Sequence, residues 1–136
     1  MLRFLATGLT FLVLSGCSGR QEDADDSFQR VGLSDIGTAY QMYLGEMKRP
    51  PRSPADLRKY GNGLPLLTEA LESNDFVVFW GVNTDQVPTA ASTILAYHKN
   101  AQDNAGFVLF ADGSVRKVTA QEFSSIPKVA NSGASG

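Results

Sequence analysis

The chain has little of what builds covalent or metal-centred sites. Its 136 residues include one cysteine, Cys17, and one histidine, His98. A lone cysteine excludes an internal disulfide, so a fold in an oxidising compartment has to be stabilised by packing. A catalytic zinc site takes three protein ligands, commonly with more than one histidine, and the sequence offers neither a second histidine nor a second thiol. We therefore predict no metal and no cofactor.

Charge is sparse and nearly balanced. Twelve basic residues against fourteen acidic ones give a formal net charge of −2, which is too weak an imbalance to indicate a nucleic-acid partner. Hydrophobic residues make up 43% of the chain, enough to bury a core in a domain of this length. The composition favours one folded domain with tails.

No apolar run is long enough to cross a membrane as a helix. The longest, residues 4–14, follows Arg3 and falls short of the roughly 20 residues that a spanning helix needs, as is typical of a signal peptide. It ends in Leu14-Ser15-Gly16-Cys17, which resembles the lipobox of bacterial lipoproteins. The resemblance implies that residues 1–16 are cleaved and that lipid on Cys17 holds the chain to a membrane. Ser18 after the cysteine favours the outer membrane over the inner one. An ordinary signal peptide or a membrane anchor, with Cys17 incidental, is the alternative.

The rest of the chain divides into a tether, a domain and a tail. Residues 17–27 are polar and acidic and predict a flexible tether, and residues 125–136 predict a flexible tail. The domain is expected over residues 28–124. It opens with apolar residues at steps of three and four, which predict an amphipathic helix to about Lys48, stopped by two prolines. These residues are Phe28, Val31, Ile36, Ala39, Tyr40, Tyr43, Leu44 and Met47.

Shorter helices are expected on either side of the strand region. Ser53 followed by Pro54 is typical of a helix start with a capping serine, and residues 66–71 predict a second short helix. Asp56 and Glu69 are interpreted as acidic residues near helix N-termini rather than as an acid-base pair. Residues 119–123 predict a closing helical turn.

Four strands are expected in the second half of the domain. β-branched and aromatic runs at residues 76–80, 93–97, 106–111 and 114–118 predict them. Asp112-Gly113 between the last two is typical of a hairpin with a two-residue type I′ turn, which would pair Phe110 with Val115 and Leu109 with Arg116. The pattern as a whole predicts an α+β fold with the N-terminal helix packed on a small antiparallel sheet.

Chemistry-bearing side chains are few. His98 with Asp103 and Asp112 could be a metal or acid-base group, but the carboxylates lack the alternating spacing of a calcium loop. We interpret His98 as a strand-end histidine satisfied by hydrogen bonds. Four strand aromatics are expected in the core, with a binding surface as the alternative: Phe79, Trp80, Tyr97 and Phe107.

The order of these parts is similar to a known family. A helix carrying Ile36-Gly37-Thr38-Ala39-Tyr40, prolines after it, and strands ending in Asp112-Gly113-Ser114-Val115 resemble the pilin-like domain of prepilin-processing-associated proteins, whose signature is a histidine followed by Asp-Gly. The spacing from His98 to Asp112 is longer than in that signature, which a longer loop over residues 99–105 would explain. The family's prepilin motif is absent, and the lipobox stands in its place.

The resemblance implies a helix lying across an antiparallel sheet, used as a structural or secretion-associated module without catalytic residues. The sequence therefore predicts a non-enzymatic, lipid-anchored envelope protein, whose partners are the membrane, through Cys17, and envelope proteins. The alternative is a small periplasmic ligand-binding or hydrolytic lipoprotein with a site formed by residues 82–92 and His98.

Overall fold

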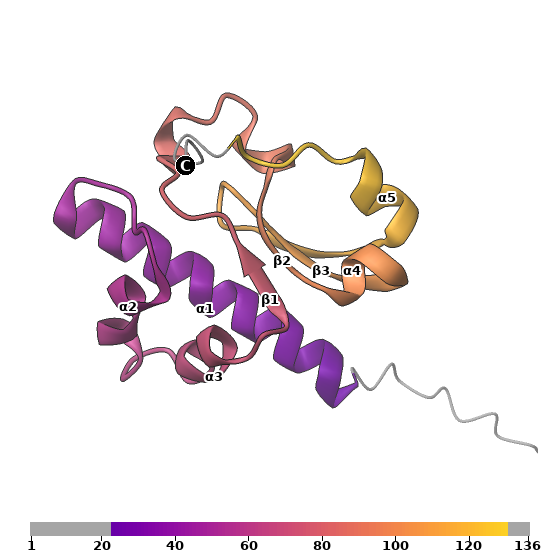
Figure 1. Cartoon of the computed structure of the whole chain (residues 1–136), viewed down its shortest axis with the longest axis horizontal. Helices are drawn as coiled ribbons and strands as arrows, with labels where there is room; N and C mark the ends of the chain where they lie inside the picture. The colour runs from indigo at the N-terminus through magenta and orange to yellow at the C-terminus, as the bar shows by residue number, and fades with distance from the viewer. Residues whose placement is uncertain (1–22, 131–136) are drawn as a thin grey trace, which may run out of the picture.

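A long helix lies across an antiparallel sheet in the computed structural model, which describes residues 23–130 (Figure 1). The sheet is a meander in the order β1-β2-β3-β4, and α1 packs against β3 and β2. The predicted α+β fold is confirmed. The lipobox, Cys17 and the final six residues lie outside the described residues. The main elements are α1 (Ala24–Met47), β1 (Phe76–Val78), β2 (Ile94–His98), β3 (Ala105–Phe110) and β4 (Val115–Thr119).

Helix α1 begins four residues earlier than its apolar pattern indicated, so the tether prediction is wrong for residues 24–27. Asp25 and Asp26 lie in the first turn, where a negative charge interacts favourably with the helix dipole. Asp25 also accepts a hydrogen bond from the Gln29 amide at 2.8 Å, and the Gln29 oxygen accepts one from the Phe107 backbone at 3.2 Å. Acidic residues that lower hydropathy thus stabilise the helix start and fasten it to β3.

The end of α1 depends on a left-handed residue, and its contact with the sheet depends on a residue without a side chain. Lys48 caps the helix in the left-handed conformation, with φ of 58°, and donates to the Leu44 carbonyl. At Gly37 a Cβ atom in place of the hydrogen would lie 2.8 Å from a Leu109 methyl, because α1 and β3 approach closely there. A larger residue would require the buried Leu109 side chain or the helix to shift, which explains a glycine inside a helix that it weakens.

Both faces of the sheet are covered. The face toward α1 buries Leu95, Phe107 and Leu109, and the opposite face buries Tyr97, Val108 and Phe110. The second layer includes α4 (Asn100–Asp103) and α5 (Ala120–Ser125), which contribute Ala101 and Phe123. Strands buried on both sides carry continuous apolar runs, so strand parity alone could not identify a single buried face.

The β3–β4 hairpin exists, but the predicted two-residue turn is wrong. Leu109 pairs with Val115 and Val108 with Arg116, one residue out of the predicted register. The loop has three residues: Gly113 donates to the Phe110 carbonyl at 2.9 Å, and only Gly113 has a positive φ, of 92°. This is a type I turn followed by a left-handed glycine. Asp112 stays out of the left-handed region, and its carboxylate accepts from the backbone and hydroxyl of Ser114 at 3.0 and 2.6 Å.

The short helices lie close to where the sequence placed them. They are α2 (Pro54–Leu57), η1 (Arg58–Tyr60), α3 (Leu67–Glu72), η2 (Thr84–Gln86) and η3 (Ala90–Ser92). Asp56 and Glu69 are in the first turns of α2 and α3, as expected, and Thr119 forms a capping box with Glu122 at the start of α5. Ser53 precedes α2, but its side chain makes no capping hydrogen bond, so that part of the prediction is wrong.

The C-terminal segment, residues 126–130, is part of the fold and not of a flexible tail. Ile94 donates to the Pro127 carbonyl and accepts from the Val129 backbone, each at 2.9 Å, in a parallel bridge. Val129 is buried and belongs to the same core cluster as the buried residues of α1. The strand pairing is irregular between Ile94 and Ala96. As a result, the Leu95 carbonyl accepts a hydrogen bond from the Phe79 backbone, just after β1, while the neighbouring Ile94 binds the C-terminal segment. β1 and the C-terminal segment therefore pair with the same edge of β2, one after the other along the strand.

Candidate functional site

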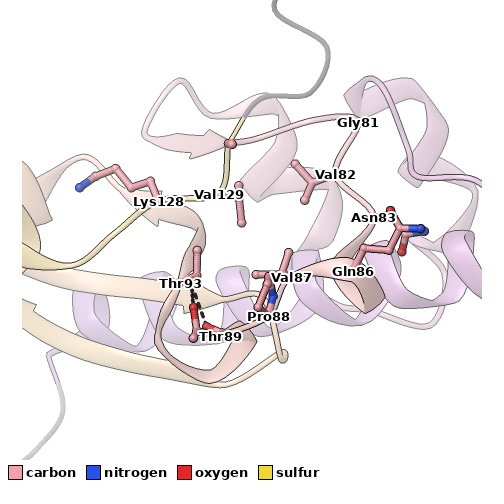
Figure 2. A pocket seen from close by; sticks show the side chains of 11 residues that line it. Gly81, Val82, Asn83, Gln86, Val87, Pro88, Thr89, Thr93, Lys128 and Val129 are labelled. Carbon is pink, nitrogen blue, oxygen red and sulfur yellow. Dashed lines mark hydrogen bonds between the residues drawn. The ribbon is translucent and has the colours of Figure 1, made fainter.

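A pocket of about 410 Å³ opens where the chain leaves β1 and the C-terminal segment joins the sheet (Figure 2). Three stretches form it: the chain after β1, the loop around η2 up to the start of β2, and the C-terminal segment. The lining residues are Gly81, Val82, Asn83, Gln86, Val87, Pro88, Thr89, Thr93, Lys128, Val129 and Ala130.

Helix α1 holds the first wall in place through Tyr40. The Tyr40 hydroxyl donates to the Phe79 carbonyl and accepts from the Val82 backbone, both at 3.0 Å, and its ring stacks on Trp80. Burial raises the pKa of Tyr40 to about 12, with the Val82 hydrogen bond acting in the opposite direction. Gly81, with φ of 75°, donates to the Pro51 carbonyl at 2.8 Å. The wall is therefore anchored to the long helix and to the proline segment after it.

Hydrogen bonds fix the loop around η2, which forms the second stretch of the lining. The Asn83 side chain accepts from the Asp85 backbone at 3.1 Å, and the Gln41 amide of α1 donates to the Thr84 hydroxyl at 2.9 Å. The hydroxyls of Thr89 and Thr93 lie 2.9 Å apart, and Thr93 also donates to the Thr89 carbonyl. These bonds shape the loop without any contribution from a charged side chain.

The one charged residue of the lining turns its charge away from the pocket. The Lys128 ammonium donates to the carbonyls of Phe123 and Ile126 at 3.1 and 3.2 Å and lies 4.1 Å from the centre of the Phe123 ring. Figure 2 shows this side chain extending outward. Carbonyls at a helix C-terminus carry partial negative charge, which stabilises the cation there. The pocket is left with apolar, amide and hydroxyl groups.

The backbone of Lys128 adds a hydrogen-bonding edge to the pocket. The Pro127 carbonyl and the Val129 N–H point toward β2 and hydrogen-bond to the Ile94 backbone. Successive residues of an extended chain present these groups to opposite edges, so the N–H and C=O of Lys128 face away from β2. Within residues 23–130 nothing hydrogen-bonds to them. The pocket therefore combines uncharged side chains with one free backbone N–H and C=O pair, that of Lys128.

His98 lies at the other end of β2. It is the last residue of the strand and 4% exposed, its Nδ1 accepts from the Asn100 backbone at 3.2 Å, and its ring meets Phe76 edge-on. Burial lowers the pKa of His98, while the carboxylates of Asp25 and Asp75 act in the opposite direction. This is the hydrogen-bonded strand-end histidine that the sequence indicated.

The other side chains proposed with His98 are dispersed. Asp103 is exposed on α4, and Asp112 lies in the β3–β4 loop, where hydrogen bonds from Ser114 lower the pKa of its carboxyl. At about 3.3 Å per residue, His98 is roughly 16 Å along β2 from Thr93 in the pocket. The structure thus does not bring His98 together with residues 82–92, as the alternative site required. Among the described residues, no three acidic, histidine or cysteine side chains form a group that could hold a metal ion.

The aromatic residues of the strands serve the core. Tyr97 and Phe107 are buried, and Phe79 and Trp80 are half-buried against the core clusters. The sequence indicates only part of the pocket, because it points to residues 82–92 as a site but predicts a flexible tail where residues 128–130 form part of the lining. Ile126 and Val129, two apolar residues in a polar stretch, were the available signal.

Comparison with protein-family models, curated proteins and solved structures gave no match to this chain. Within residues 23–130, no helix has the length and apolar character to span a bilayer.

Proposed function

We propose that this protein is a non-enzymatic envelope lipoprotein that binds other envelope proteins, as a structural, secretion-associated or pilus-associated module. The observation that carries the proposal is the uncharged pocket at the edge of β2, with the free backbone edge of Lys128 beside it. The lipobox ending in Cys17 supports attachment to a membrane through lipid, with the outer membrane favoured. Several acyl chains on one residue would hold the domain stably.

The pocket suits an extended segment of a partner protein. A peptide adding to a strand edge forms main-chain hydrogen bonds, and neighbouring pockets receive its alternate side chains. Lys128 supplies the N–H and C=O, while Val82, Val87 and Val129 supply apolar walls. Asn83 and Gln86 supply amides at the rim. An uncharged segment would match these groups without burying an unpaired charge.

The arrangement of α1 on the sheet supports the pilin-like part of the proposal. The helix lies across the antiparallel sheet as in the family that the sequence resembles. In this chain the lipobox would replace the filament-forming segment. The domain would then act at the membrane surface rather than within a pilus shaft.

Site-specific photocrosslinking in living cells tests the proposal. A photoreactive phenylalanine analogue at Gln86, on the pocket rim, should crosslink to a discrete envelope protein. The same analogue at Gln121, an exposed glutamine on α5, is the matched control and should give no such product. Equal products from the two positions, or none from Gln86, would argue against a protein-binding pocket.

A further inference from the structure

Half of the basic residues in the described chain gather in one short stretch. Five of the ten lysines and arginines of residues 23–130 lie between positions 48 and 59, and all five are exposed. We call these residues the basic end: Lys48, Arg49, Arg52, Arg58 and Lys59. Only Glu46 and Asp56 are acidic in and around this stretch, whereas the remaining described residues carry an excess of acidic groups.

Three cations elsewhere in the described chain are paired with carboxylates within the fold. Lys99, Arg116 and Lys117 form ion pairs with Asp75, Glu122 and Asp26, at 2.6, 3.4 and 2.7 Å. In the basic end only Lys59 is paired in this way, with Glu46 at 2.9 Å. Lys48, Arg52 and Arg58 form no ion pair with any residue that the structure describes. Their charges remain available to an outside partner.

Aromatic contacts hold the basic end together. Arg49 and Lys59 both lie over the Tyr43 ring, 5.8 and 5.6 Å from its centre, which joins the end of α1 to η1. Glu46 accepts from Tyr60 at 2.6 Å as well as from Lys59. These contacts hold Arg49 and Lys59 against the end of α1, and the basic end is named for that position. It lies at the end of α1 opposite to Ala24, about 36 Å along the 24-residue helix (Figure 1).

Exposed apolar side chains accompany these charges. Met42 and Met47, 48% and 40% exposed, are the large hydrophobic side chains most open to solvent in the described residues, and both lie in the last two turns of α1. A polyanionic polymer would bind the cations and leave the methionines exposed. An anionic bilayer contacts both kinds of side chain, because phosphate headgroups attract the cations while apolar side chains enter the headgroup boundary.

We propose that the basic end docks on a bilayer surface rich in anionic phospholipid. This contact is additional to any lipid on Cys17 and does not depend on it. If Cys17 is lipidated and the same membrane is bound, both the N-terminal lipid and the basic end hold the domain at one surface. If a second membrane is bound, the domain bridges the two.

A vesicle-tethering assay tests the docking. The chain from residue 17 onward is held on neutral phosphatidylcholine vesicles by an N-terminal polyhistidine tag and a chelating lipid, so that the assay needs no lipid on Cys17. These vesicles are mixed with acceptor vesicles that contain phosphatidylglycerol or phosphatidylcholine alone. We expect tethering to the anionic acceptors only, weakened by added salt and unchanged between pH 6 and 8, because lysine and arginine stay charged there.

Two triple variants with equal loss of charge separate docking from net charge. The first variant removes three unpaired cations of the basic end, by Lys48→Gln, Arg52→Gln and Arg58→Gln. Each cation near the surface contributes roughly five-fold to membrane affinity, so this variant should weaken tethering about 100-fold. Lys99→Gln, Arg116→Gln and Lys117→Gln is the control and should retain most of it. Equal loss in both variants, or equal tethering to neutral and anionic acceptors, would overturn the proposal. Circular dichroism establishes that each variant is folded.

Discussion

Replacing Tyr40 by phenylalanine tests how the pocket wall is attached to α1. The hydroxyl makes two 3.0 Å hydrogen bonds, to the Phe79 carbonyl and from the Val82 backbone, and both Tyr40 and Val82 are buried. The variant leaves the Val82 N–H without an acceptor and removes the donor to Phe79. An unsatisfied buried group costs about 1 to 3 kcal/mol, so Tyr40→Phe should lower the free energy of unfolding by about 2 to 4 kcal/mol.

Urea denaturation followed by circular dichroism measures this difference. Tyr97→Phe is the matched control, since its hydroxyl accepts a single 2.9 Å bond from the exposed Gln102 amide. It should cost about 0.5 to 1.5 kcal/mol. Equal unfolding midpoints for the parent and Tyr40→Phe would refute the anchoring role of Tyr40.

The same residue predicts how stability depends on alkaline pH. The pKa of Tyr40 is about 12 in the folded chain and near 10 in the unfolded chain. A raised folded-state pKa gives a contribution that is fully present below pH 10 and is lost as pH rises toward 12. The parent should therefore lose stability over that window more steeply than Tyr40→Phe. Parallel pH profiles would contradict the burial of this hydroxyl.

Three further outcomes follow from the hairpin, the C-terminal segment and His98. Gly113→Val should lower the free energy of unfolding, measured by urea denaturation, by about 1 to 3 kcal/mol because of the positive φ alone, since no atom crowds its Cβ position. Gly63→Val is the control: the site is equally uncrowded and has no positive φ, so the loss should be much smaller. Equal losses would contradict the turn. Val129→Ala should cost about 1 to 2 kcal/mol by the same method, whereas a flexible tail would tolerate it with no change. His98→Ala should leave the zinc, copper and iron content unchanged by elemental analysis, and loss of one bound equivalent would point to a metal site.

Periodicity and turn residues predicted the elements of the fold, while the register of the hairpin depended on one side chain. Asp-Gly suits a two-residue type I′ turn as well as a three-residue loop with a left-handed glycine. The carboxylate of Asp112 binds Ser114 in the second arrangement, and Asp112 then needs no positive φ. Such a local hydrogen bond shifts β4 by one residue and is not visible in a hydrophobic pattern.

The limits of the domain were misjudged for a related reason. Asp25 and Asp26 lower hydropathy and so indicated a tether, yet acidic residues are favourable in a first helical turn. Val129 stands nearly alone in a polar stretch, and its burial depends on a pairing with Ile94, more than thirty residues earlier. Long-range pairing of this kind carries almost no local signal, and it supplies one of the three stretches that form the pocket.

Metabolic labelling with an alkyne fatty acid tests most directly the proposal that this is a lipid-anchored envelope protein. The parent chain and Cys17→Ala are produced in a bacterial host, and the incorporated label is detected on the purified chains. We predict label on the parent, carried by the fragment that begins at Cys17, and none on the variant. Label that persists in Cys17→Ala, or a parent that takes up none, would contradict lipid anchoring at this residue.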